Sequence, residues 1–185
     1  MAKNKIKYGL KNVHYAVITE EGGNITYGTP KPIPGAVSLS ATAKGEKNEF
    51  YADDILFFGT TANQGYEGEL EVAMIPDEFR KDVMGDKTDQ HGVIFEDASA
   101  TPKNIALLFE FSGDQHASRC ALYYVMIARP DIESETKKAQ IEPKTEKLKF
   151  MAGPHPKTEI PFAKCYPEKK AQYDAWFQTV HEYTE

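Results

Sequence analysis

Apolar and polar residues alternate along much of the chain, and residues that favour turns separate the alternating stretches. Alternation with a period of two is typical of strands that have one buried face. The clearest strand is expected at residues 66–74. Its apolar side carries Tyr66, Gly68, Leu70, Val72 and Met74. The pleat then places Glu67, Glu69 and Glu71 in a row on the opposite face.

Seven other segments are expected to be strands, because they are rich in β-branched, aromatic and alternating apolar residues. They are residues 13–19, 25–27, 36–43, 48–51, 55–60, 105–112 and 119–128. The last two are the most apolar and are expected to form the core. In residues 36–43 one face carries Val37, Leu39 and Ala41. The prolines of residues 30–34 suit an extended edge segment. Residues 142–149 are so densely charged that a solvated strand or a loop is expected there.

Two helices are expected, a short one in the middle of the chain and one near its C-terminal end. Pro76 suits a first helical position and Gly85 suits the position after the last turn, so residues 76–84 are expected to be helical. Phe79 and Val83 lie four residues apart, which lets both dock on a sheet. Around residues 168–182 the pattern changes to that of an amphipathic helix. Its apolar stripe is Tyr173, Trp176, Phe177 and Val180, which is expected to complete the core, the alternative being an interface with a partner.

The whole pattern predicts a mainly β fold of the α+β class, namely an antiparallel β-sandwich or partly closed barrel with a short helix and a C-terminal helix. The chain has 185 residues, which fits a single domain spanning residues 1–185. Residues 44–65 hold polar and turn-forming sequence around two short apolar runs, and a long loop is expected there.

Composition narrows the classes of function. The formal charge is −6, so the chain has no basic balance with which to hold nucleic acid by bulk charge. Its two cysteines, Cys120 and Cys165, make no disulfide framework and no zinc-binding pair, and reduced thiols are expected. The basic N-terminal residues lead into no apolar run, so neither a signal peptide nor a membrane span is expected.

The sequence offers little that would support catalysis. The five histidines form no metal-binding motif, and there is neither a G-x-S-x-G elbow nor a phosphate-binding loop. We therefore expect no enzyme activity, no cofactor and no metal. Three alternatives stay open: a Cys–His pair, a metal site at Asp86, Asp89 and His91, and a cation site at Glu49, Asp53 and Asp54. An ordinary solvated turn or contact loop is favoured for both acidic groups.

Several short motifs, taken in their serial order, suggest a family. They are Gly9-Leu10-Lys11-Asn12-Val13-His14-Tyr15-Ala16, Tyr51-Ala52-Asp53-Asp54, Asn63-Gln64-Gly65-Tyr66-Glu67-Gly68-Glu69-Leu70-Glu71, Ile75-Pro76, Ala106-Leu107-Leu108-Phe109-Glu110, Tyr123-Tyr124 and Ala128-Arg129-Pro130. No motif is specific by itself. Their order and spacing over residues 8–130 resemble the major tail proteins of long-tailed, non-contractile bacteriophages.

The resemblance implies a structural virion protein of tail-tube fold. Its copies would assemble in the host cytoplasm into hexameric rings, and the rings would stack into the hollow tail tube of the virion. DNA would pass through the lumen during ejection without specific binding. The implied partners are other copies of the chain, a tape measure protein inside the tube, and the tail terminator and tail-tip proteins. No membrane partner is implied.

The resemblance also suggests roles for two groups of residues. Glu67, Glu69 and Glu71 would line the lumen, where carboxylates repel phosphates, although an ordinary solvated sheet face explains such a row as well. Family members use a long loop after an early strand for contacts between stacked rings. Here that role falls to residues 44–65, with Tyr51, Asp53 and Asp54 as the best candidates. The alternative is that Phe50 and Phe57 are core residues within an ordinary loop.

Two other functions remain open at this point. One is a tube subunit of a related machine, such as a contractile tail or a type VI secretion system, because such tubes share the fold. The other is a small β-sandwich that binds a ligand such as a carbohydrate. Ten tyrosines make an aromatic groove conceivable, but the sequence places no carboxylate pair on one.

Overall fold

The computed structural model of the protein describes residues 4–136 and 143–184. Strands make up 49% and helices 8%, which confirms the mainly β class. The strands are β1 (Lys7–Glu21), β2 (Asn24–Tyr27), β3 (Lys31–Pro32), β4 (Ala36–Lys44), β5 (Lys47–Ala52), β6 (Ile55–Thr61), β7 (Gly65–Val72), β8 (Lys87–Thr88), β9 (Ile94–Phe95), β10 (Ile105–Gly113), β11 (Ser118–Ile127), β12 (Glu146–Gly153) and β13 (Phe162–Cys165). The helical elements are α1 (Asp77–Phe79), the short π-helix η1 (Arg80–Met84) and α2 (Lys170–Ala175).

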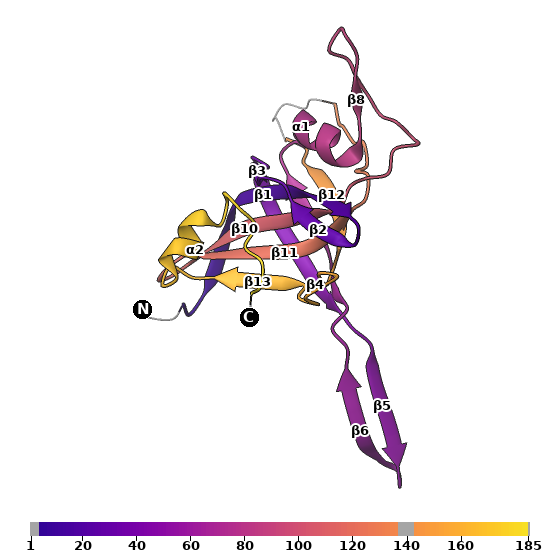
Figure 1. Cartoon of the computed structure of the whole chain (residues 1–185), viewed down its shortest axis with the longest axis vertical. Coiled ribbons are helices and arrows are strands. Elements are labelled where there is room, and N and C mark those ends of the chain that lie inside the picture. Colours follow the sequence, from indigo (N-terminus) through magenta and orange to yellow (C-terminus); the bar gives the residue numbers. More distant parts are fainter. Residues whose placement is uncertain (1–3, 137–142, 185) are drawn as a thin grey trace.

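One antiparallel sheet of nine strands, counted over the described residues, is the frame of the molecule (Figure 1). Its strands run in the order β2-β1-β10-β11-β12-β7-β4, with β3 beside β1 and β13 beside β11. β12 links the two halves, because it pairs with the end of β11 and along its length with β7. β1 and β4 come close, but no ladder joins them within the described part of the chain. The sheet therefore rolls up without closing into a barrel.

The main core lies between the two halves of the rolled sheet. Alternate residues of five strands fill it, among them Val13, Tyr15, Leu70, Val72, Leu107, Phe109, Leu122, Leu148 and Phe150. The predicted helix at residues 76–84 is present as α1 and η1, and it ends at Gly85, whose φ of 78° is the left-handed conformation of a helix terminus. Phe79 and Val83 are fully buried, which confirms that this short helix docks on the sheet.

A second core covers the other face of β1, β10 and β11. Its members are Ala16, Ala106, Leu108, Ala121, Tyr123, Cys165, Trp176 and Val180. The Trp176 indole N–H donates to the carbonyl of Cys120 at 3.2 Å, so the C-terminal segment completes the core of its own chain. The expected helix at residues 168–182 is too long, because α2 ends at Ala175. The chain then crosses the sheet, and the Tyr123 hydroxyl donates to the carbonyl of His181 at 2.6 Å.

The densely charged segment near residues 142–149 is a structural strand, contrary to the expectation of a solvated strand or loop. Residue 142 lies outside the described residues. From Glu146 onward the chain forms β12, in which Leu148 and Phe150 are buried while Lys147 and Lys149 point outward. The sequence prediction gave too much weight to the charged residues, which alternate with apolar residues that pack in the core.

Three residues of the expected apolar faces are exposed, namely Val37, Ala41 and Met74. Ala36 pairs with Val72 and Ser38 pairs with Glu71, so Val37 is the extra residue of a β-bulge and 54% of it is exposed. Met74 lies beyond the end of β7 and is 72% exposed. A bulge and a strand end both break the period of two, and the sequence pattern marks neither.

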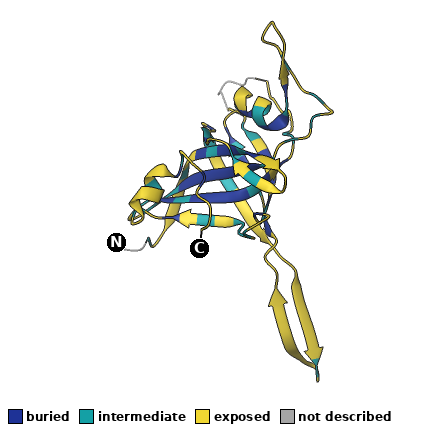
Figure 2. Ribbon diagram, in the orientation of Figure 1, coloured by how far each residue is buried: buried dark blue, intermediate teal, exposed yellow. Residues whose placement is uncertain are grey.

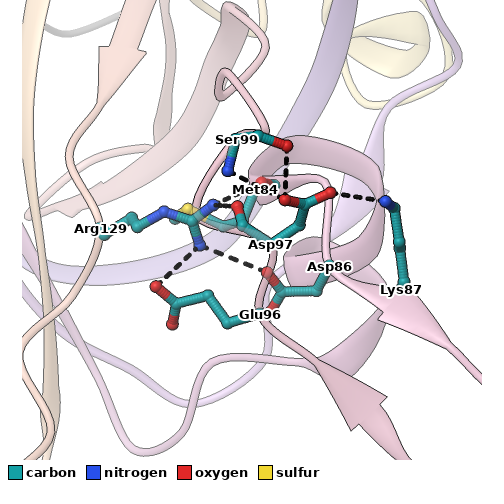
Figure 3. A network of polar contacts seen from close by, with 7 residues as sticks. All are labelled: Met84, Asp86, Lys87, Glu96, Asp97, Ser99 and Arg129. Atoms are coloured by element: carbon teal, nitrogen blue, oxygen red, sulfur yellow. Dashed lines mark hydrogen bonds and ion pairs between the residues drawn. The ribbon is translucent and has the colours of Figure 1, made fainter.

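At one end of the long axis, a segment built around β8 and β9 is tied to the body by Arg129. The guanidinium lies between carboxylates and carbonyls (Figure 3). Its Nη1 is 3.3 Å from both Asp86 Oδ1 and Glu96 Oε1, and its Nη2 donates to the carbonyls of Met84 and Asp97 at 3.2 and 2.9 Å. Arg129 therefore holds both ends of this segment, where it leaves the body and where it returns.

Candidate functional site

A two-stranded arm projects from the opposite end of the long axis (Figure 1). We call residues 45–64 the arm; it consists of the hairpin β5–β6 and its flanking residues. The strands expected at residues 48–51 and 55–60 are confirmed in it. Every arm residue is exposed except Ala52, which is half-buried, and Figure 2 shows the hairpin standing clear of the body.

The arm carries a large amount of exposed apolar surface. Six large side chains are each between 53% and 70% exposed, namely Phe50, Tyr51, Ile55, Leu56, Phe57 and Phe58. The alternative that Phe50 and Phe57 are core residues is therefore wrong. Monomeric soluble proteins rarely expose contiguous apolar patches of this kind, which mark interaction sites. An isolated two-stranded hairpin is also only marginally stable in water.

Both faces of the hairpin are apolar. Phe50 pairs with Phe58 and Tyr51 pairs with Leu56. Residues directly opposite each other share a face, and Phe50 and Tyr51 are successive residues of β5, so the two pairs lie on opposite faces. The register shift between the pairs leaves Phe57 as an extra residue of β6, which is how Leu56 and Phe58 come to face opposite ways. An ordinary hairpin of an antiparallel sheet has one face on the core and one in water. This one fits an environment that covers both.

The arm leaves the body through a neck where two backbones pass very close. A Cβ atom added to Gly45 would lie 1.8 Å from the carbonyl oxygen of Ala62, and one added to Gly65 would lie 1.9 Å from that of Ala152. Gly65 also has a φ of 103°, which side chains rarely adopt. Beyond the neck, the hydrogen bond from Ala62 N–H to Glu46 C=O continues the pairing of β4 with β7 into the arm.

The predicted contact residues Asp53 and Asp54 form the turn at the tip of the arm. Their φ angles are 51° and 61°, so both are left-handed, as a two-residue turn of type I′ requires. Aspartate is a favoured residue at such positions, which gives these carboxylates a conformational role as well. The third candidate, Tyr51, points its hydroxyl to Glu49, with 2.9 Å between the oxygens.

The structure also leaves one face of the sheet open. The face of β7 opposite the core carries Glu67, Glu69 and Glu71, which confirms the alternation expected for this strand. Together with neighbouring residues of β4, β11 and β12 it forms a hollow of about 790 Å³. Met126 and Met151 are exposed in this hollow. The sheet is therefore covered on both faces at β1, β10 and β11 but on only one at β7.

Each of the three carboxylates has a partner on a neighbouring strand. Glu67 forms an ion pair with Lys44 of β4, and Glu69 forms one with Lys147 of β12 at 3.0 Å. Hydroxyl groups of Thr145 and Ser38 donate to Glu71 and hold the pKa of its carboxyl below its usual range.

With Lys149, three lysines stand beside three glutamates on this face. The face is balanced in charge, so repulsion of phosphates by a purely acidic surface does not follow from it. That Glu67, Glu69 and Glu71 line a lumen stays a prediction.

β4 ends the sheet; part of it comes close to β1, but within the described part of the chain no strand forms a ladder with its outer edge. An unpaired edge presents a row of backbone donors and acceptors to another strand. β4 is nine residues long, and the arm begins where it ends. The open edge, the open face and the arm therefore lie along one continuous stretch of chain.

The geometry gives little support to a Cys–His pair or to a metal site at either group of acidic residues. Among residues 4–136 and 143–184, no three histidine, cysteine or acidic side chains lie close enough together to hold a metal ion. Asp86 pairs with Arg129, and Asp89 accepts hydrogen bonds from the backbone of His91 and Val93. Both thiols are buried, and desolvation raises the pKa of Cys120 to about 11, away from that of a reactive thiolate.

Sequence reasoning missed most of the arm's apolar residues as functional candidates, because alternating aromatic strands look like core strands. Two signals point the other way. Ile55, Leu56, Phe57 and Phe58 are consecutive, so both faces of one strand are apolar, and a glycine lies at each end of the arm. In the part of the chain that is described, no helix is both long and apolar enough to cross a membrane. A scan against models of protein families finds no match for the chain, and a search of curated proteins finds none either.

Proposed function

We propose that this chain is a self-assembling structural subunit, and that its copies form stacked hexameric rings that make the tail tube of a long-tailed bacteriophage, through which DNA is ejected. The observation that carries the proposal is the arm. It exposes six large apolar side chains on both faces of a hairpin that the body does not touch. Such a hairpin becomes stable and soluble when another copy covers it.

The open edge of β4 and the open face of β7 support the same proposal. A head-to-tail contact between copies gives a closed ring when repeating the rotation from one copy to the next leads back to the first copy. It gives an open filament when it does not. One chain can use both, with the sheet edge for one contact and the arm for the other. The arm lies at one end of the long axis and the β8–β9 segment at the other, which suits a subunit with two distinct ends (Figure 1).

The decisive experiment compares the full chain with a variant that lacks the arm. Residues 46–62 are replaced by a short Gly-Ser linker, which joins β4 to β7 as a simple hairpin. We expect the full chain to form rings and tubes as its concentration rises, seen by negative-stain microscopy and sedimentation velocity. The armless variant is expected to remain monomeric at every concentration.

Thermal unfolding provides the control. Because no arm residue belongs to either core, the armless variant is expected to melt within a few degrees of the full chain. A full chain that stays monomeric under all conditions, or an armless variant that still forms tubes, would contradict the proposal.

A further inference from the structure

Residues 4–7 and the C-terminal part of the body enclose a groove of about 520 Å³, which we call the N-terminal groove. The lining residues that matter to its chemistry are Lys5, Ile6, Lys7, Lys164, Tyr166 and Glu168. Three lysines thus stand against one glutamate. No carboxylate of the described residues lies within ion-pair distance of Lys5, Lys7 or Lys164.

The groove also has an apolar component. Ile6 is 60% exposed and Tyr166 is 37% exposed. The Tyr166 ring packs edge-on against His116, with 5.4 Å between the ring centroids, and Lys164 Nζ lies 4.8 Å from the Tyr166 centroid. The groove therefore offers an aromatic surface beside positive charges.

Its wall is fixed by hydrogen bonds between distant parts of the sequence. Asn4 donates to the carbonyl of His116 at 2.8 Å and accepts from the backbone N–H groups of Gln115 and His116. Asp114 accepts from the N–H groups of Lys5 and Ile6 at 2.8 and 3.3 Å. Desolvation raises the pKa of Asp114, but these N–H donors outweigh it and hold the pKa below its usual range. The groove is therefore formed before anything binds in it.

The arm has the complementary character. Four carboxylates and one lysine give residues 45–64 a net charge of −3. Asp53 and Asp54 stand at the tip, with Tyr51, Ile55 and Leu56 directly behind them. None of these carboxylates forms an ion pair with a described residue of its own chain. The lysines of the groove and the carboxylates of the arm thus have no ion-pair partner among the described residues of their own chain. Each surface carries the opposite charge that the other one needs.

We propose that the tip of the arm of one copy docks in the N-terminal groove of the next copy, with its acidic turn against Lys5 and Lys164 and its apolar residues against Ile6 and Tyr166. The inference rests on the proposed function and names the two surfaces of one contact between copies. Figure 1 shows the arm leaving the body on the side away from the N-terminal end and pointing outward, so the contact joins two chains. Each copy has one arm and one groove, and the contact propagates head to tail.

A charge exchange tests the inference. E49K, D53N and D54G together leave one carboxylate and two lysines on the arm, and Asn-Gly keeps the type I′ turn. K5E and K164E invert the groove. We expect each variant alone to need about tenfold or more higher concentration to assemble, because like charges then face each other. Assembly is expected to return when both sets are combined in one chain, and also when the two variants are mixed, since every junction can then pair opposite charges.

Two controls keep the result interpretable. K81E/K157E changes the total charge as much as K5E/K164E does, but at exposed lysines outside the groove, and is expected to assemble like the unmodified chain. Thermal melting checks that every variant folds. A disulfide between copies carrying D54C and copies carrying I6C provides a direct readout, because the native thiols are buried.

The outcomes separate the inference from the function on which it rests. Restored assembly together with the D54C–I6C cross-link supports the docking. If the combined and mixed variants stay unassembled while the unmodified chain forms tubes, the inference is overturned and the proposed function stands. If the unmodified chain never assembles, both are overturned.

Discussion

The body and the arm of this protein differ in how far they bury their apolar side chains and pair their charged ones. The body buries most of its large apolar side chains in two cores and pairs its buried charge, as Glu110 does with Arg119 and Lys11. The arm exposes its aromatic residues on both faces, and its carboxylates form no ion pair with any described residue of the chain. The body therefore has the means to fold alone, whereas the arm needs a second molecule to bury its surface. On the proposed function, the difference divides residues that maintain the subunit from residues that would connect subunits.

The most direct test of the difference between body and arm is to make the same substitution in both regions. Phe79 is fully buried and meets the ring of Tyr15 edge-on at 4.9 Å. Phe79→Ala is expected to lower the free energy of unfolding by about 3–5 kcal/mol, a large part of the stability of a small domain. Phe57→Ala is expected to change it by less than about 0.5 kcal/mol, because Phe57 is 70% exposed. Urea unfolding of both variants measures the difference.

For assembly the order of the two regions is expected to be reversed: substitutions in the arm have the larger effect and substitutions in the body the smaller one. Phe57→Ala together with Phe58→Ala removes two of the six large exposed apolar side chains of the arm and is expected to prevent tube formation by a folded subunit. A milder change, Phe79→Leu, keeps most of the buried volume, and its folded fraction is expected to assemble normally. If the arm substitutions lowered stability as much as Phe79→Ala, the division between body and arm would be wrong.

The second prediction concerns how firmly the body holds its own C-terminal segment. Arg119 Nε is 2.8 Å from Glu110 Oε2, and its guanidinium lies over the rings of Tyr173 and Phe177, 3.9 and 4.9 Å from their centroids. Glu110 is buried. Arg119→Met leaves Lys11 as the partner of this carboxylate and removes both stacking contacts, and it is expected to cost about 3 kcal/mol.

A double variant tests the reason for that loss. Arg119→Met with Glu110→Gln removes the buried charge as well as its partner, and it is expected to recover part of the stability in thermal or urea unfolding. The remaining deficit then reports the lost contacts of Arg119 with Tyr173 and Phe177 together with the lost ion pair of Lys11. Equal losses in the single and double variants would show that the unpaired charge of Glu110 is not the cause of the loss, and that the contacts of Arg119 with the C-terminal segment account for it.

The sequence predicted the body well because its elements follow the local pattern. Residues 66–72, 105–112 and 119–127 lie in strands β7, β10 and β11, and the helix at residues 76–84 is present with Gly85 at its end. The failures have specific causes. The bulge at Val37 breaks the alternation, and the charges of β12 hide an apolar face that meets the core through its pairing with β7.

The candidate site was harder to predict than the fold. Residues 48–51 and 55–60 were correctly expected to be strands. Their exposure arises because no third strand among the described residues pairs with the hairpin, which no local pattern encodes. Asp53 and Asp54 were singled out for contacts, and the structure adds that they also make the turn. The N-terminal groove brings Lys5 together with Lys164, and only the tertiary fold places residues so distant in sequence side by side.

The smallest expected effect is a difference in hydrogen exchange between the arm and the other projecting segment, at β8–β9. There the Asp97 carboxylate accepts hydrogen bonds from the hydroxyl and N–H of Ser99 at 2.6 and 2.9 Å and pairs with Lys87 at 2.6 Å (Figure 3). Lys87 first, and then Ser99, hold the pKa of Asp97 far below its usual range. A carboxyl whose pKa is lower in the folded state contributes stability that is full above its ordinary pKa of about 4 and is lost as the pH falls through the lowered value.

Hydrogen exchange of residues 86–104 is therefore expected to be slow at neutral pH and to become relatively faster than that of β10 once the pH drops below about 4. Asp97→Asn removes the charge at every pH, so its exchange in this segment is expected to be faster already at neutral pH and to lose the pH dependence. The arm contains no such tethered carboxylate among the described contacts, and its exchange relative to β10 is expected to stay fast throughout. Equal protection of both segments at pH 7 would show that the network around Arg129 and Asp97 does not fix β8–β9, and that this end of the molecule is as dependent on a partner as the arm.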